Sequence, residues 1–169
     1  MNKKNFKPNP ALDLVLERTI SVPPERVWAA WTEPELLIQW FTPAPWKTAA
    51  VDIDLRLGGR CVTTMESPEG VQHPNSGCYL QVEKNQLLVF TSVMSEDFRP
   101  LSPENGAGLG FTARIEIDAT PDGGTHYRAI AMHANEADYK QHADMGFADG
   151  WGAALDQLVT LMTTSPNAA

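Results

Sequence analysis

The chain has 169 residues, 43% of them hydrophobic, and a formal net charge of −8. This length and composition predict one globular domain that buries its own core without metal or disulfide staples. The acidic balance argues against a nucleic-acid partner, because phosphate binding needs clustered lysine and arginine. No stretch reaches the roughly 18 consecutive apolar residues of a membrane span, so none is expected.

Both ends of the chain are predicted to be tails. Residues 1–11 hold the only basic run, Lys3, Lys4 and Lys7, and lack the apolar segment of a signal peptide, which indicates a flexible tail and a cytoplasmic protein. The domain is expected over residues 12–163, with a short tail over residues 164–169. Cys61 and Cys78 match no zinc spacing and are too few for a disulfide framework, so free thiols are expected.

The first elements in the chain are predicted to be a strand followed by two short helices. Residues 12–21 have the alternation of a strand, and Pro24 suits the first position of a helix. Thr32-Glu33-Pro34 separates this helix from a second one that ends near Trp40. Three of the five tryptophans fall here, and such a group is more often core than ligand wall: Trp28, Trp31 and Trp40.

The middle of the chain is predicted to form an antiparallel sheet. Residues 51–57 alternate apolar and polar side chains, and Gly58-Gly59 permits a tight turn into the next strand. With the strands expected over residues 60–66, 77–83, 87–94, 109–118 and 125–133, the sheet has about seven strands and no helix between the second and the last. Residues 95–108 form a long connection rich in proline and glycine, predicted to be a mobile lid.

The last element is predicted to be one helix over residues 135–163. Asn135 caps its start, and residues from Phe147 to Met162 recur on one face at steps of three and four. Gly146, Gly150 and Gly152 each cost about 1 kcal/mol inside a helix, which indicates close packing, a kink or room for a ligand.

Three segments carry a family resemblance: VPPERVWAAWTEPELLIQW, DLRLGGR and MHANEADYKQHADMGFADGWGAALDQL. Together they resemble the single-domain proteins named after the activator of the Hsp90 ATPase, in the START-like (SRPBCC) superfamily. The resemblance implies an α+β helix-grip fold, in which a curved antiparallel sheet wraps a long C-terminal helix and often leaves a cavity. Superfamily members include lipid and hormone binders, aromatic polyketide cyclases and oxygenase ligand domains, so the fold alone does not fix the function.

Few residues point to chemistry, and each has a structural alternative. Asp138 and His142 stand four residues apart on the predicted C-terminal helix, and His133 lies just before this helix, so a metal or acid–base cluster is conceivable. The stronger prediction is a surface ion pair together with a solvated histidine. Arg56 is either an anion clamp at the cavity mouth or, preferably, part of a cross-strand salt bridge. Arg114, with Glu116, either pairs across the sheet, which we favour, or forms the polar end of a pocket. No metal or cofactor is expected.

We expect a cavity between the sheet and the C-terminal helix, because glycines and alanines around Trp151 supply little bulk. The alternative is that the tryptophans of the first helices fill this space. The predicted wall consists of Trp28, Trp31, Trp40, Arg56, Tyr79, Arg114, Tyr127, Met145, Phe147 and Trp151.

The function predicted from the sequence is binding of a small apolar or aromatic molecule, in a stress-related role. The alternatives are a cyclase- or isomerase-type enzyme, which needs an acid and a base converging in the cavity, and a chaperone- or self-interaction module with an exposed apolar patch. A homodimer is left open. Ionisable groups to look for in the cavity are Arg56, Glu66, Tyr79, Arg114, Tyr127, His133 and His142.

Overall fold

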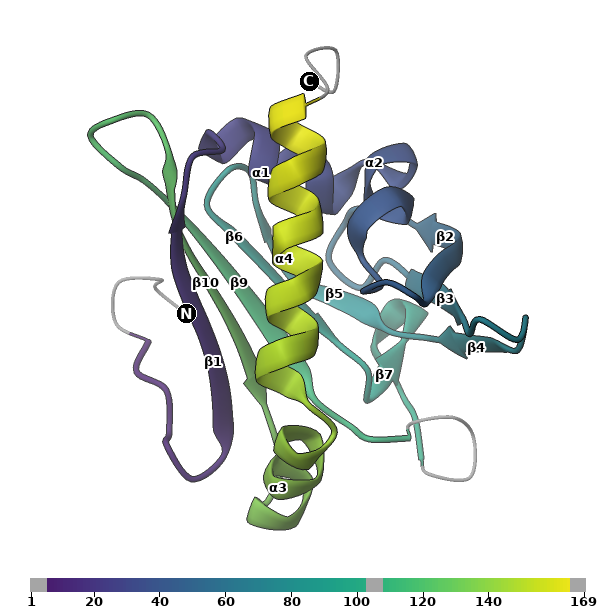
Figure 1. The fold of residues 1–169 in the computed structure, drawn as a ribbon. Helices are drawn as coiled ribbons and strands as arrows, with labels where there is room; N and C mark the ends of the chain where they lie inside the picture. The colour runs from purple at the N-terminus through teal and green to yellow at the C-terminus, as the bar shows by residue number, and fades with distance from the viewer. Residues whose placement is uncertain (1–5, 103–107, 165–169) are drawn as a thin grey trace.

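The computed structural model describes residues 6–102 and 108–164, and its centre is a five-stranded antiparallel sheet crossed by a long helix (Figure 1). In spatial order the strands are β1 (Asp13–Ile20), β10 (Thr125–Met132), β9 (Thr112–Ala119), β6 (Leu87–Thr91) and β5 (Cys78–Glu83). A second sheet holds β2 (Lys47–Ile53), β3 (Cys61–Glu66) and β4 (Gln72–Asn75), and a ribbon holds β7 (Met94–Ser95) and β8 (Arg99–Pro100). The helices are α1 (Pro24–Thr32), α2 (Pro34–Trp40), α3 (Glu136–Asp144), α4 (Phe147–Thr164) and the 3₁₀ turn η2 (Glu96–Phe98).

This order confirms the predicted α+β helix-grip architecture, with differences in detail. The described residues form ten strands instead of about seven. The additional ones are β4 in a predicted turn, β7 at the end of the strand predicted over residues 87–94, and β8 in the predicted lid. A single bridge between Arg60 and Cys78 joins the second sheet to β5. Between β2 and β9 the described residues contain no α-helix, only the one-turn η2.

The tryptophans of α1 and α2 form part of the core. Trp28, Trp31 and Trp40 are 6%, 5% and 3% exposed, and the rings of Trp31 and Trp40 lie 4.9 Å apart, edge to face. The Trp40 Nε1–H donates to the carbonyl of Ala30 at 2.9 Å, so the indole is buried with its polar group satisfied. Gln157 of α4 donates to the carbonyls of Trp40 and Thr42, each at 2.9 Å, which ties the two helical layers together.

The predicted single C-terminal helix is wrong, because the chain breaks between α3 and α4. Gly146 has a φ of +91°, a left-handed conformation that ends a helix and that glycine adopts without steric cost. Its N–H bonds to the carbonyl of Ala143 at 3.0 Å, which closes the last turn of α3. The kink that the glycines indicated is therefore a full break, and α3 lies below α4 in Figure 1.

Gly152 has a different role, which is to give space to an arginine of β1. A Cβ at position 152 would lie 2.7 Å from Nη2 of Arg18, whose Nη1 contacts Oδ1 of Asp156 at 2.6 Å. The missing side chain lets the guanidinium lie against the backbone of α4. By contrast, a Cβ at Gly150 would meet nothing within 4 Å.

These two positions give a matched pair of substitutions. Gly150→Ala should raise the free energy of unfolding by about 1 kcal/mol, because it removes the conformational cost of glycine inside a helix without a clash. Gly152→Ala should gain less, since Arg18 must move. Urea denaturation of both variants measures the difference. Equal stabilisation by the two substitutions would contradict the role assigned to Gly152.

The two faces of the large sheet have different partners. Side chains alternate along β9, so Ile115 and Ile117 face α4 while Arg114 and Glu116 occupy the outer face. Leu155, Leu158 and Met162 of α4 are at most 2% exposed and complete the inner core. The outer-face pair Arg114 and Glu116 is also buried, at 2% and 4% exposure. The favoured pairing across the sheet is confirmed for Glu116, whose Oε2 lies 2.7 Å from Nη2 of Arg128 on β10. Arg114 pairs along its own strand, since its Nε lies 2.6 Å from Oε1 of Glu116.

Arg56 does not lie on a strand as predicted, because β2 ends at Ile53 and residues 54–60 form a tight connection. Gly59 N–H donates to the Arg56 carbonyl at 2.9 Å, and Gly58 has a φ of +72°. The Arg56 side chain contacts Asp54 at 2.7 Å and reaches Asp97 at 3.2 Å. The preferred salt-bridge interpretation is confirmed, but the bridges do not cross a strand pair, because their acidic partners lie in the same connection and in η2.

The predicted lid divides into two parts. Residues 95–102 include Ser95 of β7, the turn η2 and β8. Arg56 and Arg60 both contact the carboxylate of Glu96 in η2, at 3.3 and 3.4 Å. Residues 103–107 lie outside the described residues. The predicted mobility of this connection stays a prediction.

The two cysteines are free thiols, as expected. The bridge pairs Arg60 with Cys78, and neighbouring strand residues point to opposite sides, so Cys61 faces away from Cys78. Burial raises the pKa of Cys61 to about 11, which keeps this thiol protonated near neutral pH. In the described part of the chain, no helix has the length and apolar character needed to cross a membrane.

Candidate functional site

Aromatic rings gather where α3, α4 and the adjacent ends of β9 and β10 meet. We call Phe111, His133, His142, Phe147 and Trp151 the ring cluster. The centroid of His142 lies 5.0 Å from Phe111, 5.4 Å from Phe147 and 6.0 Å from Trp151. Phe147 and Trp151 are 4.6 Å apart on successive turns of α4. The cluster therefore places two imidazoles within a wall of apolar rings.

A chain of hydrogen bonds fixes the proton positions of the two histidines. His133 Nδ1 lies 2.8 Å from the carbonyl of Leu12, and a carbonyl only accepts, so Nδ1 carries the proton. In the neutral ring, His133 Nε2 is then an acceptor, and it lies 2.8 Å from His142 Nδ1, which must donate. His142 Nε2 is consequently an unprotonated acceptor, and it has no hydrogen-bond partner among the described residues.

The prediction of a solvated histidine with a surface ion pair is wrong. His133 and His142 are 6% and 7% exposed and bond to each other. Asp138 belongs to the cap of α3, where its N–H donates to Asn135 Oδ1 at 2.8 Å. The described residues contain no group of three or more candidate metal ligands.

Burial, together with the neighbouring His133, lowers the pKa of His142 from 6.5 to about 4. His142 is therefore neutral near pH 7, and its stabilising contribution is complete above the unfolded pKa and lost as the pH falls toward the folded value. Between about pH 7.5 and about pH 5 the loss should be on the order of 2 kcal/mol.

Urea denaturation of the wild type and of His142→Phe at both pH values isolates this contribution. The variant should lose less stability than the wild type over the same interval. Equal pH dependence of the two proteins would show that His142 titrates normally.

The α4 side of the ring cluster offers space. Added Cβ atoms at Gly146 and Gly150 would meet nothing within 4 Å, and these glycines stand one turn apart beside Phe147 and Trp151. Met145 at the same corner is 67% exposed. The exposed, flexible thioether of Met145 and the glycine at position 146 thus directly precede Phe147 in the chain.

The structure distributes the predicted cavity wall over several places. Five members lie in the buried core: Trp28, Trp31, Trp40, Tyr79 and Tyr127. Phe147 and Trp151 belong to the ring cluster, and Met145 lies exposed at its edge. Arg56 and Arg114 do not join them, because Arg56 sits in the charged connection after β2 and Arg114 on the outer face of the sheet.

Among the ionisable groups considered for an acid–base site, the structure brings together His133 and His142. Glu66 contacts Lys47 at 2.9 Å on the second sheet. Burial raises the pKa of both Tyr79 and Tyr127, so these hydroxyls stay protonated in the core.

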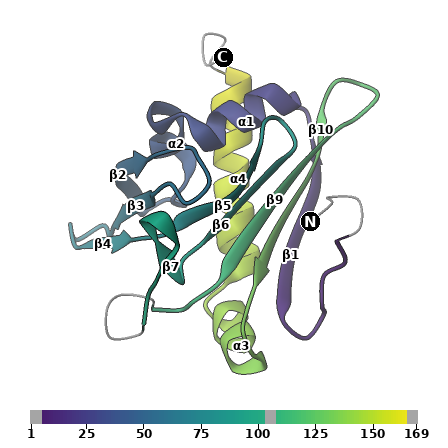
Figure 2. The same cartoon turned by 180° about the vertical axis from the view of Figure 1, so that it is seen from behind.

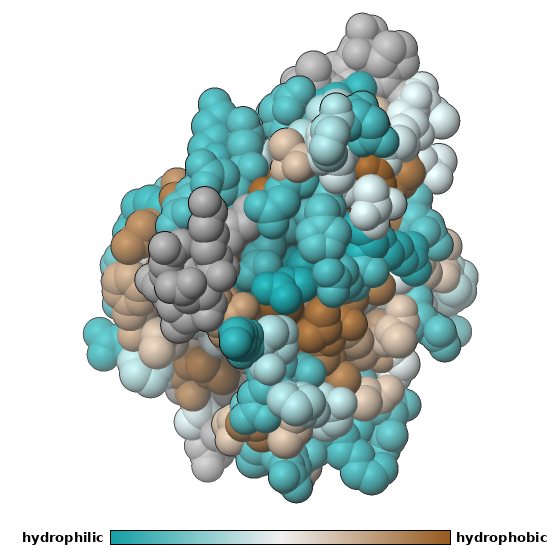
Figure 3. Space-filling view, turned by 90° about the vertical axis from the view of Figure 1, so that its left-hand side faces the viewer, coloured by the Kyte–Doolittle hydropathy of each residue, from teal (hydrophilic) through white to brown (hydrophobic). Residues whose placement is uncertain are grey.

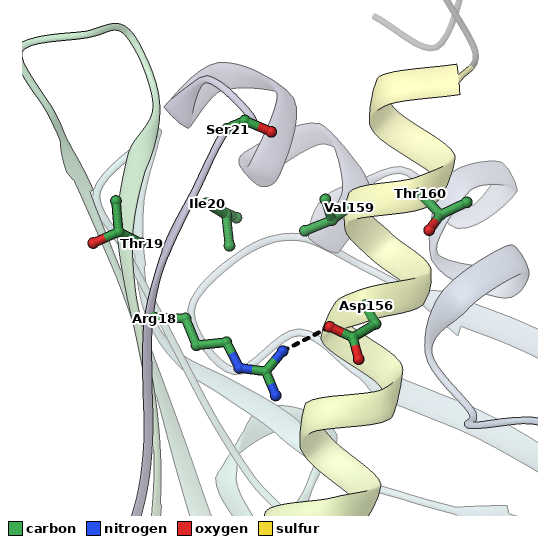
Figure 4. Close-up of a pocket in the computed structure, with 7 residues that line it drawn as sticks. All are labelled: Arg18, Thr19, Ile20, Ser21, Asp156, Val159 and Thr160. Carbon is green, nitrogen blue, oxygen red and sulfur yellow. Dashed lines mark hydrogen bonds and ion pairs between the residues drawn. The ribbon is translucent and has the colours of Figure 1, made fainter.

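Two surface grooves border α4 but hold none of the predicted wall residues. The first, of about 520 Å³, lies between β1 and α4 and is crossed by the Arg18–Asp156 ion pair (Figure 4). Its lining consists of Arg18, Thr19, Ile20, Ser21, Asp156, Val159 and Thr160. The second shares Asp156 and Thr160 with it. Seen from the β1 side, hydrophobic residues gather below a band of hydrophilic residues (Figure 3).

Sequence reasoning placed Phe147 and Trp151 together but missed Phe111 and the histidine pair as a unit. The available signal was weak: His133 directly follows the last strand and His142 lies on the next helix.

A curved antiparallel sheet closed by a C-terminal helix defines the helix-grip fold of the START-like superfamily. The family described as "Activator of Hsp90 ATPase homolog 1-like protein" matches residues 21–163. The chain belongs to this family.

Solved structures with this fold come from several bacteria. A crystal structure of a Nitrosomonas europaea protein is 42% identical with a TM-score of 0.88, covering 94% of this chain and 99% of that one. A Mycobacterium smegmatis protein is 25% identical with a TM-score of 0.74, covering 92% and 93%. A Rhodobacter sphaeroides protein, 21% identical with a TM-score of 0.78 and covering 94% and 97%, is similar in fold. No curated protein matches the chain.

Proposed function

We propose that this protein binds a small aromatic or apolar molecule that carries one hydroxyl or N–H group, at the ring cluster. The observation that carries the proposal is the acceptor at His142 Nε2, held unprotonated by the chain of hydrogen bonds from Leu12 through His133. A single polar group within an apolar wall is the usual way in which a pocket orients a ligand.

Three features support this site. Phe111 and Trp151 are partly exposed, so their rings offer apolar area to a planar molecule. The open space over Gly146 and Gly150 allows a ligand to approach α4 closely. The lowered pKa of His142 keeps its ring neutral near pH 7, where it accepts a hydrogen bond from a neutral donor. We also propose that the protein is cytoplasmic and that its partner is this small molecule.

Binding of 2-naphthol and of naphthalene tests this function, since the two probes differ by one hydroxyl. The wild type should prefer 2-naphthol by about threefold to tenfold, the range expected for one hydrogen bond in a buried site. His142→Phe should bind naphthalene as before and lose the preference. Affinities are measured by isothermal titration calorimetry.

The matched control is His126→Phe, because His126 lies on β10 with 42% of its side chain exposed and bonds to Glu17. It should retain the wild-type preference. If the wild type shows no preference, or if His142→Phe keeps it, the acceptor role of His142 is wrong.

A further inference from the structure

The outer face of the large sheet, turned to the viewer in Figure 2, carries a buried cluster of three charged residues. Glu116 lies between two arginines: its Oε1 is 2.6 Å from Nε of Arg114, and its Oε2 is 2.7 Å from Nη2 of Arg128. The side chains of Arg114 and Glu116 are only 3% and 5% exposed. One carboxylate therefore serves two guanidinium groups, which leaves one positive charge in excess.

Arg114 also has an unsatisfied donor. Its Nη2 is buried and has no hydrogen-bond partner, so of its polar atoms only Nε donates to a described residue. The residues beside it in the neighbouring strands, Val89 of β6 and Ile130 of β10, are apolar and offer no side-chain acceptor. A buried donor without an acceptor, on a charged group, is unfavourable, and an anion would supply both the acceptor and the opposite charge.

The nearest carboxylate on β1, that of Glu17, does not balance the charge of the two arginines. Glu17 is the register partner of Arg128, but its side chain is 52% exposed and its Oε1 contacts Nε2 of His126 at 2.7 Å. It therefore faces solvent and a different partner. Within the cluster of Arg114, Glu116 and Arg128, the two guanidinium groups therefore face one carboxylate.

The segment before β1 covers this cluster. Asn9 forms a side-chain-stabilised turn, in which its Oδ1 accepts from Ala11 N–H at 3.0 Å and its own N–H donates to Asp13 at 2.7 Å. This turn leads the chain back so that the ring of Phe6 lies 4.6 Å from Cζ of Arg114. An aromatic ring over a guanidinium excludes water from one side of it and strengthens electrostatic contacts on the other.

We propose that Arg114, supported by Arg128, is a binding site for a small anion, a carboxylate or a phosphate, beneath Phe6. The anion accepts from Arg114 Nη2, and it balances the charge that Glu116 leaves uncompensated. A guanidinium suits either ligand, because its planar fork matches the oxygens of both groups. This site lies on the opposite face of the sheet from α4 and is independent of the ring cluster.

Arginine side-chain NMR of the full chain tests the site. Acetate and inorganic phosphate are titrated separately at constant ionic strength, and the Nε–Hε signal of Arg114 is assigned from the spectrum of Arg114→Lys. The signal should shift saturably with half-saturation at about 1 mM for at least one of the two anions. Saturation by acetate alone identifies a carboxylate site, and saturation by phosphate alone a phosphate site.

Two variants distinguish a site from general screening. Arg128→Gln removes the excess charge at a position that is 22% exposed, and it should weaken binding about tenfold or more. Arg99→Gln changes an exposed arginine of β8 and should leave the saturation curve unchanged. Absent or non-saturating shifts of Arg114, or equal shifts of all the arginine signals, would overturn the proposal.

Discussion

Glu116→Gln is expected to lower the free energy of unfolding by about 3 to 5 kcal/mol, as is typical when one partner of a buried ion pair is removed. The substitution keeps the shape of the side chain but removes the charge shared by Arg114 and Arg128. The buried guanidinium of Arg114 and the partly exposed one of Arg128 are then left without their shared carboxylate. Urea denaturation monitored by circular dichroism measures the loss.

Two controls separate this effect from a general intolerance to substitution. Glu17→Gln, on the exposed side chain opposite Arg128, should change the stability by less than about 1 kcal/mol. The double variant Arg114→Met with Glu116→Leu should recover most of the loss, because it replaces the buried pair by apolar groups. If Glu116→Gln costs less than about 1 kcal/mol, the cluster is more hydrated than its burial indicates.

Trp40→Ala should destabilise the protein by a similar amount, about 3 to 5 kcal/mol. The substitution empties the space beside Trp31 and leaves the carbonyl of Ala30 without the indole N–H. The effect is a loss of core packing, so the urea midpoint should fall without a change in the slope of the transition.

Trp46→Ala is the matched control, since Trp46 is 39% exposed and its ring neighbours His73 on the edge strand β4. It should cost less than about 1 kcal/mol. A small loss for Trp40→Ala would mean that the tryptophans of α1 and α2 form a ligand wall with little role in the core.

The order of elements could be predicted because each one has a local signal. Alternation marked the long strands, and the prolines at positions 24 and 34 marked the starts of α1 and α2. The break at Gly146 was harder to predict, because a glycine inside a helical pattern is equally compatible with close packing, a kink or the end of the helix. The left-handed φ of Gly146, which ends α3, is not indicated by the spacing of the apolar residues around it.

The ring cluster could be predicted only in part. Phe147 and Trp151 share one face of α4 through their spacing, whereas His133, His142 and Phe111 meet them through tertiary contacts. The pairing of Arg114 with Glu116 follows from their alternation on one strand face. The stacking of Phe6 on Arg114 could not be predicted in this way, because it depends on the turn at Asn9 in a segment expected to be a flexible tail.

The protonation state of His142 is the most direct test of the proposed ligand site. Histidine side-chain ¹⁵N NMR at neutral pH distinguishes the two neutral tautomers and the charged ring. The hydrogen bonds from Leu12 through His133 predict a neutral His142 with its proton on Nδ1, and addition of 2-naphthol should shift the Nε2 resonance. A proton on Nε2, a charged ring, or an Nε2 resonance that 2-naphthol leaves unchanged would contradict the account.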